Sequence, residues 1–133
     1  MAVAISMLER ERLALRRPEL LREAAYIDGE WVSGSHSIDV TNPANGRTLG
    51  TVPALGASET SRAVAAAHRA FASWRARGAG DRAAILKRWH ALIIEHAEDL
   101  ARLMTAEQGK PLTEARGEVT TTSFSGQCFL NVA

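Results

Sequence analysis

The sequence of 133 residues contains little cysteine and lysine, few aromatic residues and almost no net charge. Its single cysteine, Cys128, excludes an internal disulfide and a cysteine-rich metal site. No apolar run approaches the roughly 20 residues that a membrane-spanning helix needs. The net charge of +1 supports neither nucleic-acid binding nor binding to an acidic membrane surface. Acidic residues in the Arg-rich N-terminal stretch argue against a transit peptide, so we expect a soluble, cytoplasmic protein.

The first half of the chain has the patterns of a short helical stretch followed by strands. Residues 6–25 favour helix, and Pro18 predicts two short helices or one kinked helix there. Residues 26–32 predict a β-hairpin, because Asp28-Gly29 suits a two-residue turn whose central residues have positive φ. Residues 37–41 and 48–52 predict two more strands, joined by a cluster of turn-forming residues.

From Gly56 the apolar period changes from two to about 3.6, which predicts helices. We expect the first helix to be capped by Ser58, the second by Asp81, and the third to run from Glu98 to Gly109, where a helix end favours positive φ. Pro111 then opens a fourth helix. The apolar residues expected to be buried are Val64, Ala67, Phe71 and Trp74 in the first helix and Ile85, Trp89, Leu92, Ile93 and His96 in the second. Strands followed by helices, without βαβ alternation, predict an α+β fold of N-terminal β-hairpins and antiparallel helices.

Several residues invite a functional interpretation that their context does not support. Residues 78–83 have the letters G-x-G-x-x-A of a dinucleotide fingerprint, but a predicted helix, not a strand, precedes them. Cys128 has no base or cation nearby in the sequence, so we interpret it as an incidental thiol. The four histidines, His36, His68, His90 and His96, lack metal-ligand spacing, and the tryptophans Trp74 and Trp89 fall at helical positions expected to pack in a core.

An ordered set of short motifs resembles the N-terminal part of the aldehyde dehydrogenases. The pieces are YIDGEW at 26–31, DVTNPANG at 39–46, LGTVP at 49–53, the helical stretches 56–76 and 82–105, and EQGKPL followed by EA-x-GEV at 107–119. The sequence between Glu95 and Glu118 is most similar to the succinate-semialdehyde branch of the family. The resemblance implies that this chain is the N-terminal segment of the family's cofactor-binding domain.

The resemblance also implies an activity, which this chain is not expected to perform alone. The family oxidises an aldehyde with NAD or NADP by means of a cysteine thiolate, a carboxylate-activated water and an oxyanion site. Those groups and the cofactor-binding residues belong to sequence outside the matched part, so no catalytic or cofactor-binding residue is assigned here. Gly126-Gln127-Cys128 does not match the family's nucleophile motif, which has a residue between Gln and Cys.

One minor site carries over from the resemblance. Some family members hold a monovalent cation with backbone carbonyls of the V-x-N-P turn and an acidic side chain before G-K-P. The matching residues are Val40, Thr41 and Glu107. Carbonyl and carboxylate oxygens suit such a hard cation.

The chain is expected to divide into an N-terminal helical or frayed segment (1–25), the family-like segment (26–119) and a divergent tail (120–133). The tail departs from the aromatic-rich helix of the family, which suggests an interrupted reading frame or a truncated product. An alternative to a dehydrogenase segment is therefore a non-catalytic remnant or a helical module that self-associates through exposed apolar faces. A small nucleic-acid-binding domain is the least favoured alternative, because the charge is balanced.

Overall fold

The computed structural model describes residues 10–131, and the side chains of residues 10–121. In chain order the elements are the 3-10 turn η1 (Pro18–Leu20), the strands β1 (Ala25–Ile27), β2 (Glu30–Val32), β3 (Ser37–Thr41) and β4 (Thr48–Pro53), and the helices α2 (Ala57–Arg75), α3 (Ala79–Glu95), α4 (Ala97–Gln108) and α5 (Leu112–Asn131). This confirms the predicted α+β fold with hairpins before helices. Among the described residues, no helix has both the length and the apolar character that crossing a membrane requires.

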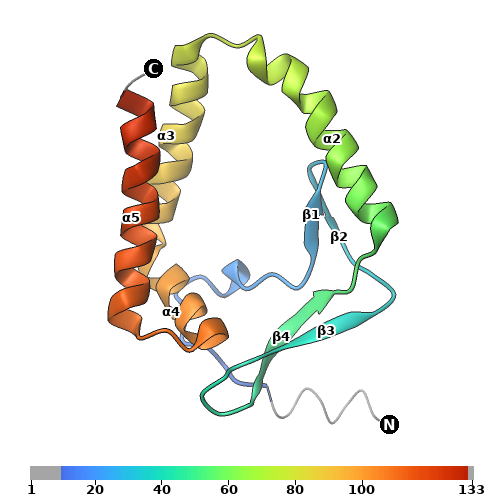
Figure 1. The fold of residues 1–133 in the computed structure, drawn as a ribbon. Helices are drawn as coiled ribbons and strands as arrows, with labels where there is room; N and C mark the ends of the chain where they lie inside the picture. The colour runs from blue at the N-terminus through green and yellow to red at the C-terminus, as the bar shows by residue number, and fades with distance from the viewer. Residues whose placement is uncertain (1–9, 132–133) are drawn as a thin grey trace.

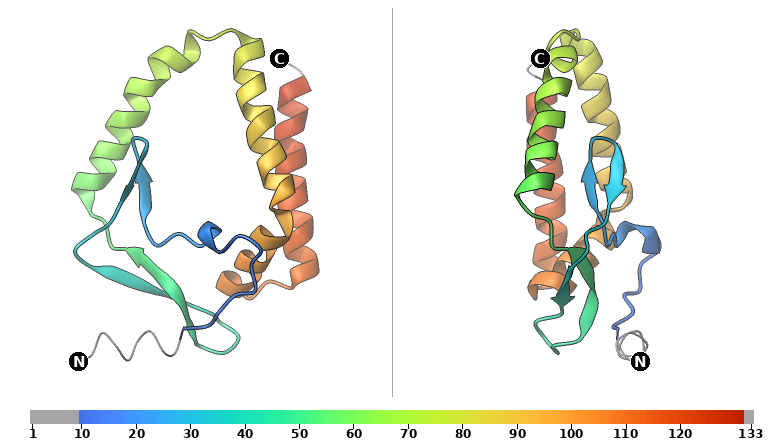
Figure 2. Two further views of the ribbon diagram at one scale, coloured as in Figure 1. Left: turned by 180° about the vertical axis from the view of Figure 1, so that it is seen from behind. Right: turned by 90° about the vertical axis from the view of Figure 1, so that its right-hand side faces the viewer.

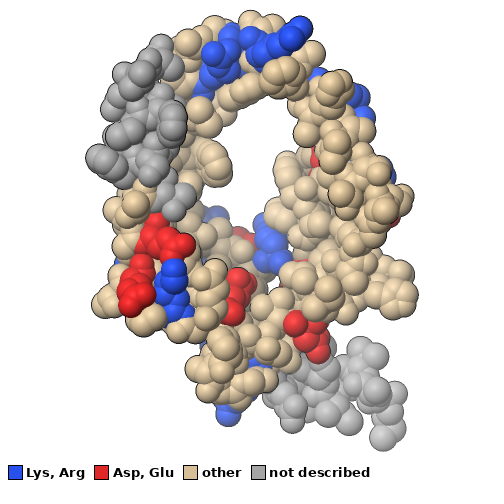
Figure 3. Space-filling view, viewed as in Figure 1, with Lys and Arg blue, Asp and Glu red and all other residues tan. Residues whose placement is uncertain are grey.

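The helices form two arms that meet at a corner (Figure 1). One arm is α2, and the other is the pair α3 and α5, which lie side by side in opposite directions. The two hairpins and the short helix α4 join the arms at the other end, as the views in Figure 2 also show. In the space-filling view an opening passes between the arms (Figure 3).

The two hairpins follow from their turn chemistry. Asp28 and Gly29 have φ values of 55° and 88°, so the predicted two-residue turn is confirmed, and β1 pairs with β2 in antiparallel register. β3 and β4 pair in a second antiparallel sheet, with an irregularity between Val40 and Thr41. The turn between them is closed by Asn42, whose carbonyl oxygen accepts the N–H of Gly46 at 2.7 Å.

The N-terminal segment differs from the prediction. Residues 10–24, which we call the strap, contain no α-helix, and η1 is their one helical turn. The prediction of helix over 6–25 is therefore wrong for the described residues, and residues 6–9 lie outside them. The physical reason is that backbone N–H groups of the strap are used in long-range bonds: Glu11 N–H donates to the carbonyl oxygen of Thr48, and those of Arg16 and Arg17 donate to Asp99.

Helix ends agree with the sequence to within a few residues. Gly109 has φ 73° and follows α4, and Pro111 precedes α5, as predicted. Two starts are shifted: α2 is capped by Gly56, whose N–H donates to Glu59, and α3 is capped by Gly78. The predicted caps Ser58 and Asp81 instead lie in the first turns.

The corner between α2 and α3 is held by an arginine. The Nη1 of Arg82 donates to the carbonyl oxygen of Arg77 at 2.9 Å and to that of Arg75 at 3.4 Å. These carbonyls belong to the last residue of α2 and to the turn that follows it, where helical partners are missing. A side chain from α3 therefore satisfies the end of α2 and fixes the bend (Figure 1).

The core lies between α3, α4 and α5 and is built from small residues. Ala101 and Ala115 are fully buried and Val119 is 6% exposed, and the half-buried residues packed around them are Ile93, Ala97, Leu100, Met104 and Leu112. Among the described residues, no large side chain is fully buried.

The predicted burial of the first two helical faces is wrong at several positions. Exposure reaches 65% at Val64, 56% at Phe71, 64% at Trp89 and 53% at Leu92. Ala67 is exposed, whereas Trp74, Ile85, Ile93 and His96 are half-buried. α2 has only one buried residue, Ala66, because its main tertiary contact is with the short strand β1. A helical period shows that a face is apolar but does not show what covers it.

Candidate functional site

The turn after β3 packs against the end of α4. A Cβ atom on Gly109 would lie 3.0 Å from Cγ of Pro43, so the ring of Pro43 packs closely on the backbone of Gly109. Asn42 is 9% exposed, and its Oδ1 accepts the N–H of Ala44 at 2.9 Å. The contact joins the two segments that carry the residues of the expected cation site.

Val40 and Thr41 precede this contact at the end of β3, and Glu107 precedes it in α4. Glu107 also lines a cavity with Ile93 of α3 and Val119 of α5. Val40 and Thr41 flank the irregularity of the β3–β4 ladder, where regular pairing of backbone groups is interrupted. Glu107 lies in the last turn of α4, two residues before Gly109, and is exposed. Helix α4 contacts β3, so carbonyl oxygens and a carboxylate are available on neighbouring elements. This donor set fits a monovalent cation in kind, because all the groups are hard oxygens.

The same turn is held by a carboxylate of the strap. Oε2 of Glu11 accepts the side-chain N–H groups of Asn42 at 3.0 Å and of Asn45 at 2.9 Å. Glu11 also lines a cavity of about 320 Å³ with Arg102 and Thr105 of α4. The hydroxyl oxygen of Thr105 is buried there without a hydrogen-bond partner among the described residues. The strap therefore restrains the turn between β3 and β4 through Glu11.

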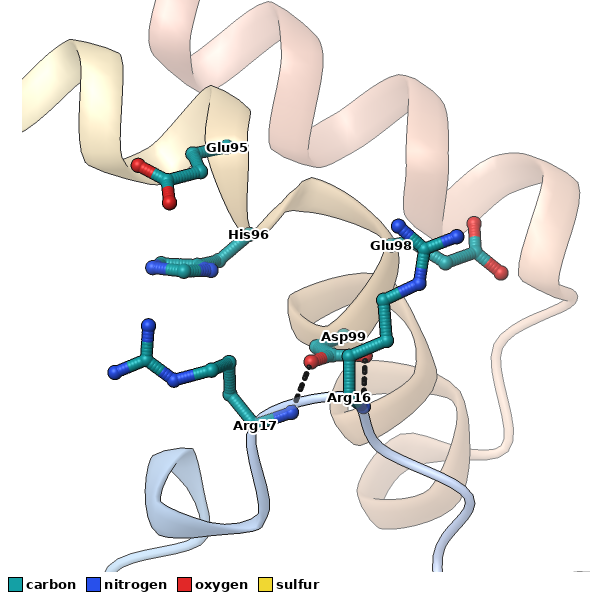
Figure 4. Close-up of a pocket in the computed structure, with 6 residues that line it drawn as sticks. All are labelled: Arg16, Arg17, Glu95, His96, Glu98 and Asp99. Carbon is teal, nitrogen blue, oxygen red and sulfur yellow. Dashed lines mark hydrogen bonds between the residues drawn. The ribbon is translucent and has the colours of Figure 1, made fainter.

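A second carboxylate, Asp99, anchors the middle of the strap to α4 (Figure 4). Its Oδ1 and Oδ2 accept the backbone N–H groups of Arg16 at 3.0 Å and Arg17 at 2.9 Å, and Asp99 itself is 3% exposed. These bonds, that of Arg16 first, lower the pKa of Asp99 below its usual value against the opposing effect of burial. A buried carboxylate with two backbone donors is a charge-assisted clamp.

The Asp99 clamp lies beside a cavity of about 250 Å³ that also has Glu95, His96 and Glu98 in its wall. In Figure 4 the ring of His96 lies between the side chains of Glu95 and Arg17. Cationic and anionic groups alternate around this cavity, and the described residues that line it include no thiol or hydroxyl nucleophile. It is therefore best described as a structural junction of the strap, α3 and α4.

Neighbouring hydrogen-bond donors lower the pKa of two further carboxylates. Hydrogen bonds from Arg116 and then Arg102, partly opposed by desolvation, lower the pKa of Glu98 to about 2, which ties α4 to α5. Burial would raise the pKa of Glu23, but the N–H and hydroxyl of Thr51, with Arg10, lower it overall. Glu23 thereby joins the strap to β4, since its Oε1 accepts the N–H of Thr51 at 2.6 Å.

The other residues considered from the sequence are not brought together. His36 is exposed in the loop before β3 and His68 is exposed on α2, and His90 and His96 lie half-buried on or after α3. Among the described residues, no group of three or more His, Cys, Asp and Glu side chains is placed to hold a metal ion. A helix and not a strand precedes residues 78–83, as predicted, but only Gly78 belongs to the interhelical connection, because residues 79–83 form the start of α3. Cys128 lies in α5 beyond the described side chains.

The sequence analysis missed the anchoring role of Glu11, Glu23 and Asp99. Asp99 carried no specific signal, because the helix dipole already explains an acidic residue in the first turn of α4. Glu11 and Glu23 carried none, because their partners are 31 and 28 residues away in the sequence.

The comparisons with known proteins agree with this arrangement. The sequence profile described as "Aldehyde dehydrogenase family" matches residues 31–130. The 3-sulfolactaldehyde dehydrogenase of Pseudomonas putida is 55% identical over 109 residues, which are 80% of this chain and 22% of that protein. The NADP(+) succinate-semialdehyde dehydrogenase GabD of Escherichia coli (strain K12) is 54% identical over 81% of this chain and 23% of its own length.

A solved structure shows the same spatial arrangement. The aldehyde dehydrogenase of Brucella melitensis biovar abortus 2308 superposes with a TM-score of 0.87 at 43% identity, over 90% of this chain and 25% of that one. The chain thus spans about a quarter of the length of the relatives that it matches. With hairpins, helices and motif order all in agreement, the chain belongs to the aldehyde dehydrogenase family.

Proposed function

We propose that this chain is the N-terminal segment of an NAD(P)-dependent aldehyde dehydrogenase that oxidises succinate semialdehyde to succinate in the cytoplasm. The observation that supports this most is the identity of 54% to the E. coli succinate-semialdehyde enzyme over four fifths of the chain. A relative named for 3-sulfolactaldehyde is as similar, at 55%. Both named substrates are aldehydes with an anionic group, so the proposed substrate class is an anionic aldehyde, with succinate semialdehyde as its first member.

In this proposal the chain contributes a scaffold and not reactive groups. The carboxylates Asp99, Glu11 and Glu23 accept hydrogen bonds that tie the strap to α4 and to the β3–β4 hairpin. The thiolate, the activated water and the cofactor site would come from the three quarters of the family fold that the match leaves out. The alternative remains a non-catalytic remnant or association module.

The test is a chimera in which residues 25–119 of this chain replace the matched segment of E. coli GabD. We expect NADP reduction with succinate semialdehyde within about tenfold of the parent enzyme, a difference of about 1.4 kcal/mol in barrier. The isolated 133-residue chain should give no aldehyde-dependent reduction of NAD or NADP. A soluble, folded chimera without activity would contradict the proposed function, as would turnover by the isolated chain.

A cation site at Val40, Thr41 and Glu107 is a second, smaller proposal. We expect K⁺ or Na⁺ to shift the backbone amide signals of Thr41 and Asn42, whose N–H groups are attached to the carbonyls of Val40 and Thr41, in NMR spectra of the whole chain. Glu107→Gln should weaken that response by about tenfold, since the carboxylate supplies the only formal charge among the three groups. Glu114→Gln is the matched control, because Glu114 is an exposed carboxylate in the first turn of α5. Equal responses of the two variants, or the same shifts with choline chloride, would exclude this site.

A further inference from the structure

The strap is a loop whose two ends meet on the β3–β4 hairpin. Nη1 of Arg10 donates to Oε1 of Glu23 at 2.9 Å, although the two residues are 13 positions apart in the sequence. The N–H of Glu11 donates to the carbonyl oxygen of Thr48 at 2.9 Å. Oε1 of Glu23 also accepts the N–H of Thr51 at 2.6 Å, so both ends of the strap are bonded to β4. A surface loop whose ends lie this close together has the form of an Ω-loop.

The middle of the strap is bonded to a different element. The backbone N–H groups of Arg16 and Arg17, which we call the tip of the strap, donate to the two carboxylate oxygens of Asp99 in α4 (Figure 4). In Figure 1 the strap accordingly runs from the hairpin to α4 and returns towards β1. One carboxylate thus receives both of these bonds, whereas the ends of the strap are bonded to the sheet.

The strap lies on the rest of the chain without burying any residue of its own. None of residues 10–24 is buried, and both residues of the tip are exposed. Segments with few buried apolar contacts open at a lower free energy than the core, and lids are drawn from such segments. The core lies elsewhere, around Ala101 and Ala115 between α3, α4 and α5. The tip can therefore leave α4 without disturbing that core.

The strap supplies part of the wall of two cavities. The tip lines the cavity of about 250 Å³ beside His96. Leu13 and Ala14 line the cavity of about 320 Å³, whose other wall includes Thr105 of α4. The hydroxyl oxygen of Thr105 is buried without a hydrogen-bond partner among the described residues. Because a buried hydroxyl without a partner costs free energy, access of water to Thr105 would favour an open position of the strap.

We propose that the strap is a hinged lid: its tip lifts from α4 while its two ends stay bonded to β4, and this motion opens the cavity beside Thr105. The bonds of Glu11 and Glu23 to β4 are made in both positions and form the hinge. The bonds of the tip to Asp99 are made only in the closed position and form the latch. This inference depends neither on the proposed substrate nor on the proposed cation.

Thiol labelling of the full 133-residue chain with a maleimide tests the lid. The chain has a single cysteine, so Cys128→Ser provides a background in which Thr105→Cys is the reporter. Adding Asp99→Asn should speed the labelling about tenfold or more, because the latch loses a charged acceptor while the hinge keeps its bonds. Ala106→Cys, at a buried position in the wall of the same cavity, is a second reporter if Thr105→Cys does not fold.

The matched control reporter is Ala115→Cys, because Ala115 is fully buried in the helical core and its labelling follows loosening of the helices. Asp99→Asn should leave the labelling rate of Ala115→Cys unchanged. Equal acceleration at this control, or no acceleration at the cavity reporter, would overturn the proposal.

Glu23→Gln separates a hinged lid from a strap that detaches as a whole. A bond that is made in both positions does not shift the equilibrium between them, so Glu23→Gln should change labelling of Thr105→Cys by less than about twofold. If Glu23→Gln accelerates labelling as much as Asp99→Asn does, the ends leave β4 together with the tip, and the hinged lid is excluded.

Discussion

Replacing Gly109 with alanine is expected to destabilise the chain by about 2–3 kcal/mol. Gly109 has φ 73°, a conformation that costs other residues about 1–2 kcal/mol. A Cβ atom would also lie 3.0 Å from Cγ of Pro43, whose ring has little freedom to move away. The change therefore strains the end of α4 and pushes the β3–β4 turn off it. The free energy of unfolding from urea titrations measures the loss.

Two other glycines separate the causes of this effect. Gly46 has φ 71°, and a Cβ atom there would meet no heavy atom within 4 Å, so Gly46→Ala should show the backbone cost alone, about 1–2 kcal/mol. Gly117 lies within α5 with open space around it, so Gly117→Ala should stabilise the helix by about 0.5–1 kcal/mol. If Gly109→Ala costs no more than Gly46→Ala, the Pro43 contact is not tight.

Releasing the strap is the second large effect that we expect. In Asp99→Asn the side chain keeps its shape, but one of the two acceptors for the Arg16 and Arg17 N–H groups becomes a donor. The strap should then open more often, and trypsin should cleave the bond after Arg16 about tenfold faster or more, since cleavage follows the population of the open form. Mass spectrometry of the digest locates and times this cut.

Glu95→Gln is the control, because Glu95 lines the same cavity without a bond to the strap backbone. It should leave the cleavage rate unchanged. Similar acceleration in both variants would mean that the general charge of the junction, and not the clamp, holds the strap.

The clamp also has a defined pH dependence. The pKa of Asp99 is lower in the folded chain than in the unfolded chain, so its contribution is complete above the ordinary carboxyl pKa of about 4. It is lost as the pH falls through the lower folded value. The amide NMR signals of Arg16 and Arg17 should therefore stay constant at neutral pH and shift only in strongly acidic solution. A midpoint at or above the ordinary pKa would contradict this.

Local chemistry accounts for the parts of the fold that the sequence predicted. Asp28-Gly29 and Gly109-Lys110-Pro111 each determine a bend within a few residues, through positive φ or a missing N–H, and both features occur as expected. Helix starts were less well predicted, because Gly56 and Gly78 compete with neighbouring polar caps.

Long-range contacts account for what the sequence did not predict. Residues 10–24 favour helix locally, yet Asp99 and Thr48 bond to their N–H groups from distant parts of the chain. The burial of Phe71 and Trp89 was expected from periodicity, which records that a face is apolar but not which chain covers it. Val40, Thr41 and Glu107 were identified by resemblance to the family, and cation binding at these residues remains a prediction.

The arginine at the bend between α2 and α3 has a consequence for assembly. Because Arg82 reaches back to the carbonyl oxygens of Arg75 and Arg77, the angle between the arms is set by bonds internal to this chain. A preorganised template loses less conformational entropy when a second polypeptide arrives. The angle between the two arms is therefore set without any further polypeptide, and a segment that packs on α2 and α3 would meet a bend that is already formed.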